Sequence, residues 1–297
     1  MDVRSIAVTG AAGFLGRALV GYFAGAGLRT HALARRALRA GGAQPAPNVV
    51  PGAYDLDAEP DPAALRGLDA LVHCAFVPHR APADRSSERN VRGTLALARA
   101  CREAGVRFVF VSSVSAATEA RSEYARHKRA IEEALAPSDA VTIRPGLVAG
   151  DGGLLRGLHD AVGRGTVPLI GGGREPVQVV SPEEVGEAIL IALRRDLRGA
   201  HNAVSVPAVP LRTIVRDLAS RASRPVRLVG VPWPAAFAAA ALAERAGIRL
   251  PLTTDNLRGL RAAAVHAPSG ALLAAGWSAL PWEARCAELR FGAAAPA

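Results

Sequence analysis

The chain is poor in lysine, aromatic residues and cysteine. Lys128 is the only lysine among 36 Lys and Arg residues, aromatic residues make up 4% of the chain, and there are 3 cysteines. Cys74, Cys101 and Cys286 have neither metal-site spacing nor an even number, which argues against a disulfide-stapled secreted scaffold. The sequence also lacks a run of about 18 apolar residues and the pattern of a signal peptide. We therefore expect a cytoplasmic protein without a membrane partner.

The chain has a surplus of positive charge, with a net charge of +10 at pH 7. Such a charge can serve nucleic acid, a membrane surface or an anionic ligand. The arginines are scattered among acidic neighbours, and the densest basic stretch is the modest ARRALR at 34–39. We therefore expect no nucleic-acid partner, and a general preference for arginine and alanine accounts for most of the surplus charge.

The first two thirds of the sequence alternates short apolar runs with helical stretches. Half of the 297 residues are hydrophobic, enough for a substantial core. This alternation predicts βαβ units, hence a doubly wound parallel sheet of the Rossmann type, an α/β fold. We expect an NADP-binding Rossmann domain at 1–150. Residues 151–297 are expected to complete this fold and to form a small substrate-binding lobe over the carboxyl edge of the sheet.

Three local patterns predict helices. Apolar positions predict a helix at about 89–104 that ends before Gly105. The sequence SPEE at 181–184 has the form of a capping box with Pro at the first helical position. The apolar segment at 231–248 indicates either a helix packed on the core or a cap over a hydrophobic substrate, and the packed helix is the favoured interpretation.

Three glycines follow the first predicted strand. Gly10, Gly13 and Gly16 lie where that strand leads into an amphipathic helix. Glycine there lets the backbone turn tightly and approach a pyrophosphate, which the N–H groups of the helix N-terminus can bind. The pattern predicts a dinucleotide site, with a bare packing turn as the alternative.

Two arginines, Arg35 and Arg36, close the second predicted strand, where no carboxylate is present. A carboxylate at this place binds the ribose hydroxyls of NAD, whereas arginine can pair with the 2′-phosphate of NADP. The sequence therefore favours NADP, with NAD as the second choice. The alternative is that both arginines are solvated residues of an arginine-rich chain.

The only lysine follows a tyrosine by four residues, so Tyr124 and Lys128 share one face of a helix. An ammonium beside a phenol favours the phenolate, and we expect it to lower the tyrosine pKa. The apolar run at 107–111 ends in Ser112 and Ser113, whose hydroxyls are expected at the same edge of the sheet. A serine, a tyrosine and a lysine in this order indicate carbonyl and alcohol chemistry.

Seven motifs together resemble the extended short-chain dehydrogenase/reductases, a group that holds nucleotide-sugar epimerases, 3β-hydroxysteroid dehydrogenases and dihydroflavonol-type reductases. The motifs are TGAAGFLG (9–16), YDLD (54–57), HCAF (73–76), NVRGT (90–94), VSSVSA (111–116), YARHK (124–128) and IRPGLVAG (143–150). The resemblance covers roughly residues 3–200. It implies a catalytic triad of Ser113, Tyr124 and Lys128. It further implies a cofactor site of Gly10, Gly13, Phe14, Leu15 and Gly16 at the pyrophosphate, Asp55 and Leu56 at the adenine, Ala75 along the dinucleotide, Pro145 and Gly146 beside the nicotinamide, and Asn90 in support.

The sequence departs from the family pattern at two places near the expected site. Phe76 replaces a small residue and is expected to narrow the pocket. The loop from Ser113 to Tyr124 is short for a nucleotide-sugar enzyme. Val114 and Ser115 replace the acidic pair of the sugar dehydratases, so dehydration is disfavoured.

Three functions are compared on this basis. The first is an NADP(H)-dependent oxidoreductase that interconverts a carbonyl and a secondary alcohol on a small or medium, hydrophobic substrate. The second is an epimerase that holds NAD and acts on nucleotide sugars, which Arg35 and Arg36 oppose. The third is a non-catalytic dinucleotide-sensing or nucleic-acid-binding protein, which the intact triad opposes. No metal site is expected, and the resemblance is compatible with a homodimer formed through helices that flank the sheet.

Overall fold

The computed structural model describes residues 1–35, 46–77, 86–117, 120–223, 225–248, 250 and 252–291. Its centre is a seven-stranded sheet in the order β11-β6-β5-β4-β1-β2-β3. Every pairing within it is parallel. The strands are β1 (Ser5–Thr9), β2 (Arg29–Ala34), β3 (Val49–Ala53), β4 (Ala70–His73), β5 (Arg107–Val111), β6 (Val141–Pro145) and β11 (Gly199–Ala203). The predicted doubly wound α/β fold is confirmed.

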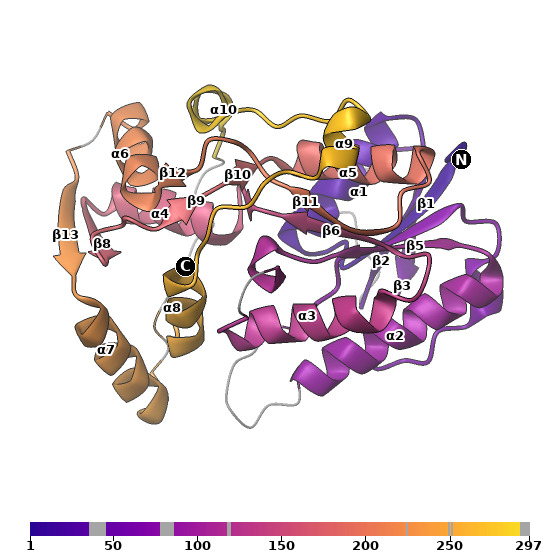
Figure 1. Cartoon of the computed structure of the whole chain (residues 1–297), viewed down its shortest axis with the longest axis horizontal. Coiled ribbons are helices and arrows are strands. Elements are labelled where there is room, and N and C mark those ends of the chain that lie inside the picture. Colours follow the sequence, from indigo (N-terminus) through magenta and orange to yellow (C-terminus); the bar gives the residue numbers. More distant parts are fainter. Residues whose placement is uncertain are drawn as a thin grey trace.

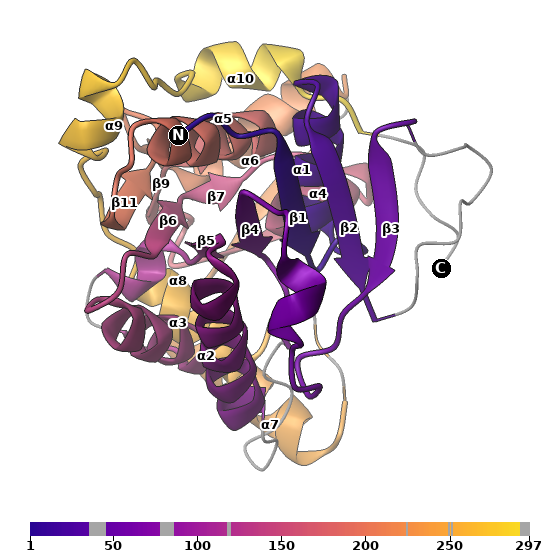
Figure 2. The ribbon, with the colours of Figure 1, turned by 90° about the vertical axis from the view of Figure 1, so that its right-hand side faces the viewer.

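Helices cover both faces of this sheet (Figures 1 and 2). On one face lie α1 (Phe14–Gly25), α5 (Pro182–Arg194) and α9 (Gly270–Ala274), and on the other lie α2 (Ser86–Ala104) and α3 (Glu123–Leu135). Each face has its own apolar core, with Phe23 and Trp277 in the first and Phe110 and Ile131 in the second. The strand order reverses at β1, between β2 and β4, and open α/β sheets bind ligands beyond the carboxyl ends of the strands at such a point.

The second half of the chain supplies a smaller lobe beside the sheet (Figure 1). Its helices are α4 (Gly153–Gly163), α6 (Leu211–Arg221), α7 (Trp233–Arg245), α8 (Thr254–Arg261) and α10 (Trp282–Glu288). Its strand pairs are β8 (Thr166–Ile170) with β13 (Arg227–Val231), β7 (Leu147–Val148) with β10 (Val179–Val180), and β9 (Pro176–Val177) with β12 (Val209–Pro210). Two short 3₁₀ helices, η1 (Pro62–Leu65) and η2 (Val114–Ala116), complete the described elements. The boundary at residue 150 stays a prediction.

The predicted end of helix α2 and the predicted start of helix α5 are confirmed. Helix α2 ends before Gly105, whose φ of +73° suits a glycine after the last helical residue. Its start at Ser86 precedes the predicted residue 89, because polar residues begin the helix before its apolar stripe does. Ser181 and Glu184 form the expected capping box of α5.

The apolar segment at 231–248 contains the last residue of β13 and helix α7. Only part of the surface of α7 is buried against the rest of the protein. Ala240 and Ala243 are its buried helical residues, and Leu242 is 70% exposed. Helix α7 contacts α8 and joins a small cluster with Ile170 and Leu257, separate from the cores of the sheet. Among the described residues, no helix has both the length and the apolar character needed to cross a bilayer.

Candidate active site

The turn between β1 and α1 is closed by glycines that side chains would disrupt. Gly10 has a φ of +69°, and a Cβ there would lie 2.8 Å from the Ala75 backbone nitrogen. A Cβ on Gly16 would overlap the Gly10 carbonyl group. These close approaches bring the predicted residues Gly10, Gly16 and Ala75 together at the sheet's carboxyl edge. The turn therefore needs glycine for its shape.

Helix α1 begins at this turn without a cap. Gly13 occupies the N-cap position, no side chain accepts a hydrogen bond there, and the first turn contains no acidic residue. The first N–H groups of a helix have no partner within the helix and carry partial positive charge, which suits a phosphate. The turn and this helix start therefore fit the pyrophosphate of a dinucleotide.

Phe14 and Leu15, which were predicted at the pyrophosphate, have packing roles in addition. The Phe14 ring lies against Gly150 and Gly152, where a Cβ would meet it within 2.9 Å. Leu15 packs against the core under α1. The glycines at 150 and 152 thus let the start of the lobe lie close to the glycine turn, a contact that the sequence analysis missed.

The adenosine end of the predicted site lies beyond β2 and β3. Arg35 is exposed directly after β2, and Arg36 lies outside the described residues. Asp55 accepts a hydrogen bond from the Asp57 N–H at 3.1 Å, and Leu56 is buried. The Asp57 carboxylate pairs with Arg89, which lowers its pKa, and Arg92 and Arg35 act in the same direction. This end of the site is therefore rich in arginine.

A buried hydrogen-bonded chain supports the carboxyl ends of β1 and β4. His73 Nδ1 lies 2.8 Å from Thr9 Oγ1, and His73 Nε2 lies 3.0 Å from Thr94 Oγ1. The Ala75 N–H donates to Thr9 Oγ1 at 3.3 Å. Burial lowers the pKa of His73 to about 3, so its ring is neutral. His73 and Thr94 belong to the HCAF and NVRGT motifs, but the sequence alone gave neither residue a role in the site.

Asn90 fixes the chain that follows β4. Its side chain accepts from the Val77 N–H at 2.8 Å and donates to the Val77 carbonyl oxygen at 2.9 Å. With 1% of its surface exposed, Asn90 holds this segment through a pair of hydrogen bonds. The segment includes Ala75 and Phe76, so the predicted supporting position of Asn90 has a structural basis.

Helix α3 presents Tyr124 and Lys128 beneath this segment. Ser122 caps the helix by accepting from the Ala125 N–H. Lys128 is 4% exposed, and its Nζ donates to the Val111 carbonyl oxygen at 2.7 Å. The ammonium lies 4.6 Å from the centroids of both the Phe76 and the Phe110 rings. Such cation–π contacts partly replace the water that burial removes.

The pKa values of the two groups depart from their ordinary values in different directions. Tyr124 is 37% exposed as a whole residue, but burial around its phenol group raises its pKa, and a hydrogen bond with Ser113 acts in the other direction. Burial lowers the pKa of Lys128 to about 8, and the nearby Cys74 and Glu132 act in the opposite direction. The expectation that Lys128 lowers the tyrosine pKa is wrong for this structure, because Nζ lies 5.9 Å from the Tyr124 ring centroid and donates to the Val111 carbonyl instead.

The serines after β5 lie at the same edge. Ser113 begins the short helix η2, and its Oγ accepts a hydrogen bond from Ser115 Oγ at 3.0 Å. Ser112 Oγ is buried and has no hydrogen-bond partner among the described residues. A buried hydroxyl without a partner is rare, and it suits a polar ligand group at this edge.

Pro145 is the last residue of the neighbouring strand β6, and Gly146 follows it. The Gly146 N–H donates to the Ala203 carbonyl oxygen at 3.1 Å, and a Cβ on Gly146 would overlap the Gln178 carbonyl. Because β5 and β6 are adjacent and parallel, these residues lie beside the serines at the carboxyl edge. The structure thus gathers the described predicted residues along one edge of the sheet.

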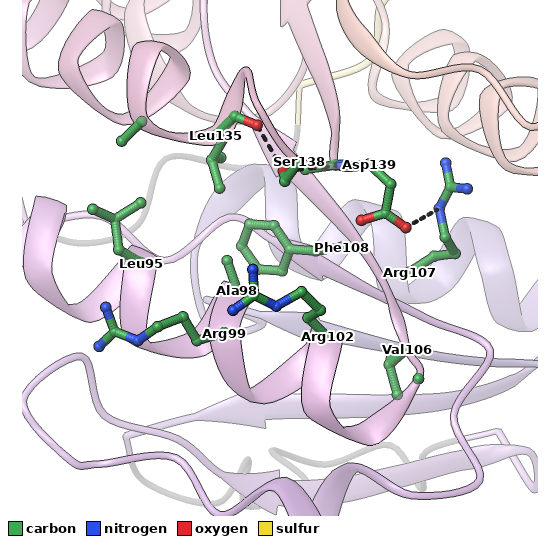
Figure 3. A pocket seen from close by; sticks show the side chains of 13 residues that line it. Leu95, Ala98, Arg99, Arg102, Val106, Arg107, Phe108, Leu135, Ser138 and Asp139 are labelled. Atoms are coloured by element: carbon green, nitrogen blue, oxygen red, sulfur yellow. Dashed lines mark hydrogen bonds and ion pairs between the residues drawn. The ribbon is translucent and has the colours of Figure 1, made fainter.

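A separate cavity of about 310 Å³ lies at the opposite edge. Figure 3 shows it between the C-terminal parts of α2 and α3, with Phe108 and Leu135 inside and Arg99 and Arg102 at its rim. Arg107 pairs there with Asp139 at 4.0 Å. Since β5 starts at Arg107 and ends before Ser113, this cavity is remote from the tyrosine and the glycine turn.

Comparisons with known proteins agree with this arrangement. The fold resembles MoeE5 in complex with UDP-glucose and NAD, with a TM-score of 0.70, 22% identity, and coverage of 95% of this chain and 96% of that one. It also resembles the UDP-glucose 4-epimerase of Thermus thermophilus in complex with NAD, with a TM-score of 0.64, 24% identity, and coverage of 88% and 100%.

A curated relative and a family model extend the likeness to the sequence. A protein of Caulobacter vibrioides (strain NA1000 / CB15N) named ceramide reductase is 30% identical over an alignment of 259 residues, and the match covers 82% of this chain and 78% of that protein. The model of the NAD dependent epimerase/dehydratase family matches residues 6–206. This match spans the glycine turn, both serines and the Tyr124–Lys128 helix. The chain therefore belongs to the NAD-dependent epimerase/dehydratase family.

Proposed function

We propose that this protein is an NADP(H)-dependent oxidoreductase that interconverts a carbonyl and a secondary alcohol on a hydrophobic substrate. The observation that carries the proposal is the joint placement of Ser113, Tyr124 and Lys128 beside the glycine turn, at the edge where open α/β sheets bind ligands. A bound nicotinamide supplies or accepts the hydride. Side chains of this protein transfer the proton and donate hydrogen bonds to the carbonyl oxygen of the substrate.

Tyr124 is the proton donor in the reductive direction. Its raised pKa keeps the phenol protonated at neutral pH, so it can donate to the oxygen of a carbonyl as that oxygen becomes an alcohol. Ser113 hydrogen-bonds with Tyr124 and is placed to donate to the same oxygen. Lys128 places a buried ammonium 5.9 Å from the Tyr124 ring centroid, and its N–H donors are expected to reach the ribose of a bound cofactor. In oxidation the proton moves in the opposite direction.

The preference for NADP rests on the arginine-rich adenosine end. Arg35 is exposed after β2, where a 2′-phosphate would be bound, and Arg36 follows it in the sequence. Arg35 helps to lower the pKa of Asp57, but that carboxylate already pairs with Arg89. A doubly charged phosphate is thus favoured over a bare ribose hydroxyl.

The hydrophobic substrate rests on two observations. The Caulobacter relative is named a ceramide reductase, which supports a carbonyl on a lipid-like molecule. Phe76 packs edge-on against the Tyr124 ring at 5.2 Å between centroids, and it adds an aromatic surface to the reacting end of the site. An apolar chain bearing a ketone fits such a wall better than a sugar ring with many hydroxyl groups.

The first test is replacement of Tyr124 by Phe. We expect Tyr124→Phe to bind NADPH with nearly unchanged affinity, because the phenol hydroxyl is not part of the glycine turn that is expected to bind the pyrophosphate. NADPH-dependent reduction of long-chain ketones should fall by about 100-fold or more, since general acid catalysis contributes that much. Nicotinamide fluorescence measures the binding and absorbance follows the reaction. A variant with wild-type turnover would show that Tyr124 is not the proton donor.

An epimerase acting on nucleotide sugars is the second candidate, because the cited structural neighbours include complexes with NAD and UDP-glucose. An epimerase must retain its oxidised cofactor between the two halves of the reaction. Protein that carries NAD through gel filtration and converts UDP-sugars would support this function. Protein that exchanges NADPH freely and ignores UDP-sugars would support the reductase.

A further inference from the structure

Helix α3, which carries Tyr124, begins against a carboxylate from the other end of the chain. Asp255 Oδ1 accepts a hydrogen bond from the Glu123 N–H at 2.6 Å, and Oδ2 accepts from the Tyr124 N–H at 3.4 Å. Asp255 belongs to α8 of the smaller lobe and is 9% exposed. In Figure 1, α8 lies beside the left end of α3, and the two helices are in contact.

These bonds satisfy N–H groups that have no partner within the helix. The first residues of any helix leave their N–H groups free, and Ser122 accepts only from Ala125. Asp255 takes the two that remain before Ala125. Its negative charge also suits the positive end of α3 and, from the first turn of α8, the positive end of its own helix.

The carboxylate is held by a connected framework in the lobe. Thr253 caps α8 with Asn256 in a capping box. Glu244 of α7 accepts from the Thr254 N–H at 2.7 Å and from Thr254 Oγ1 at 3.0 Å, which ties α7 to the start of α8. Gly259 faces the cap of α3, since a Cβ there would lie 3.6 Å from Ser122 Oγ. The position of the lobe thus determines where Asp255 lies, and Asp255 is hydrogen-bonded to the backbone N–H of Tyr124.

We propose that Asp255 is a positioning residue for Tyr124: the substrate lobe sets the first turn of α3, and thereby the phenol, through this one carboxylate. Asp255 does not contact the reacting groups; it acts on the peptide that carries the proton donor. The inference rests on the proposed function in that Tyr124 is taken as the proton donor. It adds that a substrate bound against α7 and α8 would influence the position of Tyr124 through the hydrogen bonds between Asp255 and the first turn of α3.

The test compares Asp255→Asn and Asp255→Ala with the wild type. The amide keeps one acceptor oxygen and loses the charge, whereas alanine loses both acceptors. We expect kcat for ketone reduction to fall in both variants and further in Asp255→Ala, by up to about 100-fold, because a misplacement of about 1 Å costs that much. The dissociation constant of NADPH should stay unchanged, since the glycine turn is not involved.

Asp217→Asn is the matched control. Asp217 lies in α6 of the same lobe and accepts from Trp282 Nε1 at 2.6 Å, without contacting α3. We expect it to lower the melting temperature but to leave kcat at the wild-type value. Equal losses of kcat in Asp217→Asn and Asp255→Asn would mean that Asp255 only stabilises the lobe, and would overturn the inference.

A double-mutant cycle with Ser113→Ala tests the route. If Asp255 acts by holding Tyr124 against Ser113, then Asp255→Asn should lower kcat less in the Ser113→Ala background than in the wild type. If Asp255→Asn lowers kcat by the same factor in both backgrounds, Asp255 does not act through the contact between Tyr124 and Ser113.

Hydrogen exchange tests the contact without any turnover. The amides of Glu123 and Tyr124 should exchange about 10-fold faster or more in Asp255→Ala, because a charge-assisted hydrogen bond is lost. Unchanged exchange would overturn the inference. Tyr124→Phe is measured alongside: an active Tyr124→Phe would refute the proposed function, whereas an inactive Tyr124→Phe with a fully active Asp255→Ala would refute only the positioning role.

Discussion

Lys128 should lower the stability of the folded protein at neutral pH, and its replacement by methionine should reveal the cost. Burial lowers the lysine pKa from 10.5 to about 8. Since each pKa unit corresponds to about 1.4 kcal/mol, holding the charged form in the fold costs about 3 kcal/mol relative to a solvated lysine. Methionine keeps an unbranched apolar side chain of similar length and carries no charge.

The pH dependence has a definite sign. The folded state disfavours the proton on Lys128, so the cost is fully present below about pH 8 and disappears as the pH rises to 10.5. The wild type therefore gains stability from this group over that window, and Lys128→Met does not. We expect the free energy of unfolding of the variant, minus that of the wild type, to fall by about 3 kcal/mol between pH 7 and pH 10.5.

At pH 7 the variant should be at least as stable as the wild type. The lost hydrogen bond to the Val111 carbonyl, worth about 1.5–3 kcal/mol for a charged donor, offsets part of the gain. Its turnover should nevertheless fall sharply, because the variant loses the ammonium that we expect to hold the cofactor ribose beside Tyr124. A variant that gains stability while it loses activity would mark Lys128 as a residue kept for function.

Urea titrations at several pH values measure this difference. The comparison is clean because the other 35 residues counted as Lys or Arg are all arginines, which do not titrate in this range, and all other titrating groups are common to both proteins. Arg129→Met, on the same helix, serves as the control, and its difference from the wild type should not vary with pH. A Lys128→Met difference that stays constant from pH 7 to pH 10.5 would refute the reasoning.

The remaining predictions concern the cofactor site. Gly16→Ala should abolish dinucleotide binding, because its Cβ would overlap the Gly10 carbonyl. The control Gly21→Ala lies on the same helix, and its Cβ meets open space. It should bind the dinucleotide normally and melt at a higher temperature, because alanine stabilises a helix by about 0.5–1 kcal/mol relative to glycine. Binding titrations and thermal unfolding test both variants. A Gly16→Ala protein with wild-type affinity would show that the glycine turn does not bind the dinucleotide. Arg35→Ala should weaken NADPH binding by about 10- to 100-fold and leave NADH binding unchanged, as a lost charge-assisted bond predicts. Equal losses for the two cofactors in fluorescence titrations would show that Arg35 does not read the 2′-phosphate.

The sequence predicted what depends on local pattern. The strand and helix alternation, the glycine at the end of α2 and the capping box of α5 follow from periodicity and backbone preference, and the structure confirms them. The placement of Tyr124 and Lys128 on one helix is equally local. The homodimer and the cytoplasmic location stay predictions.

What sequence reasoning missed depends on contacts between distant residues. Thr9 and His73 are 64 positions apart, and Asp255 reaches Tyr124 across 131. No local periodicity signals such pairs, because they form only when the sheet and the lobe are assembled. The Tyr124 pKa was misjudged for the same reason, since the partner that holds the Lys128 ammonium is a backbone carbonyl at the end of β5.

The single lysine also makes the protein unusually simple for chemical labelling. Among the side chains, reagents that acylate amines have a single target, the buried Lys128. With a pKa of about 8, about half of the Lys128 side chains are uncharged and nucleophilic at mildly alkaline pH, so burial limits the reaction more than protonation does. The extent of acylation at residue 128, read by mass spectrometry, thus becomes a direct gauge of how often this edge of the sheet opens to solvent.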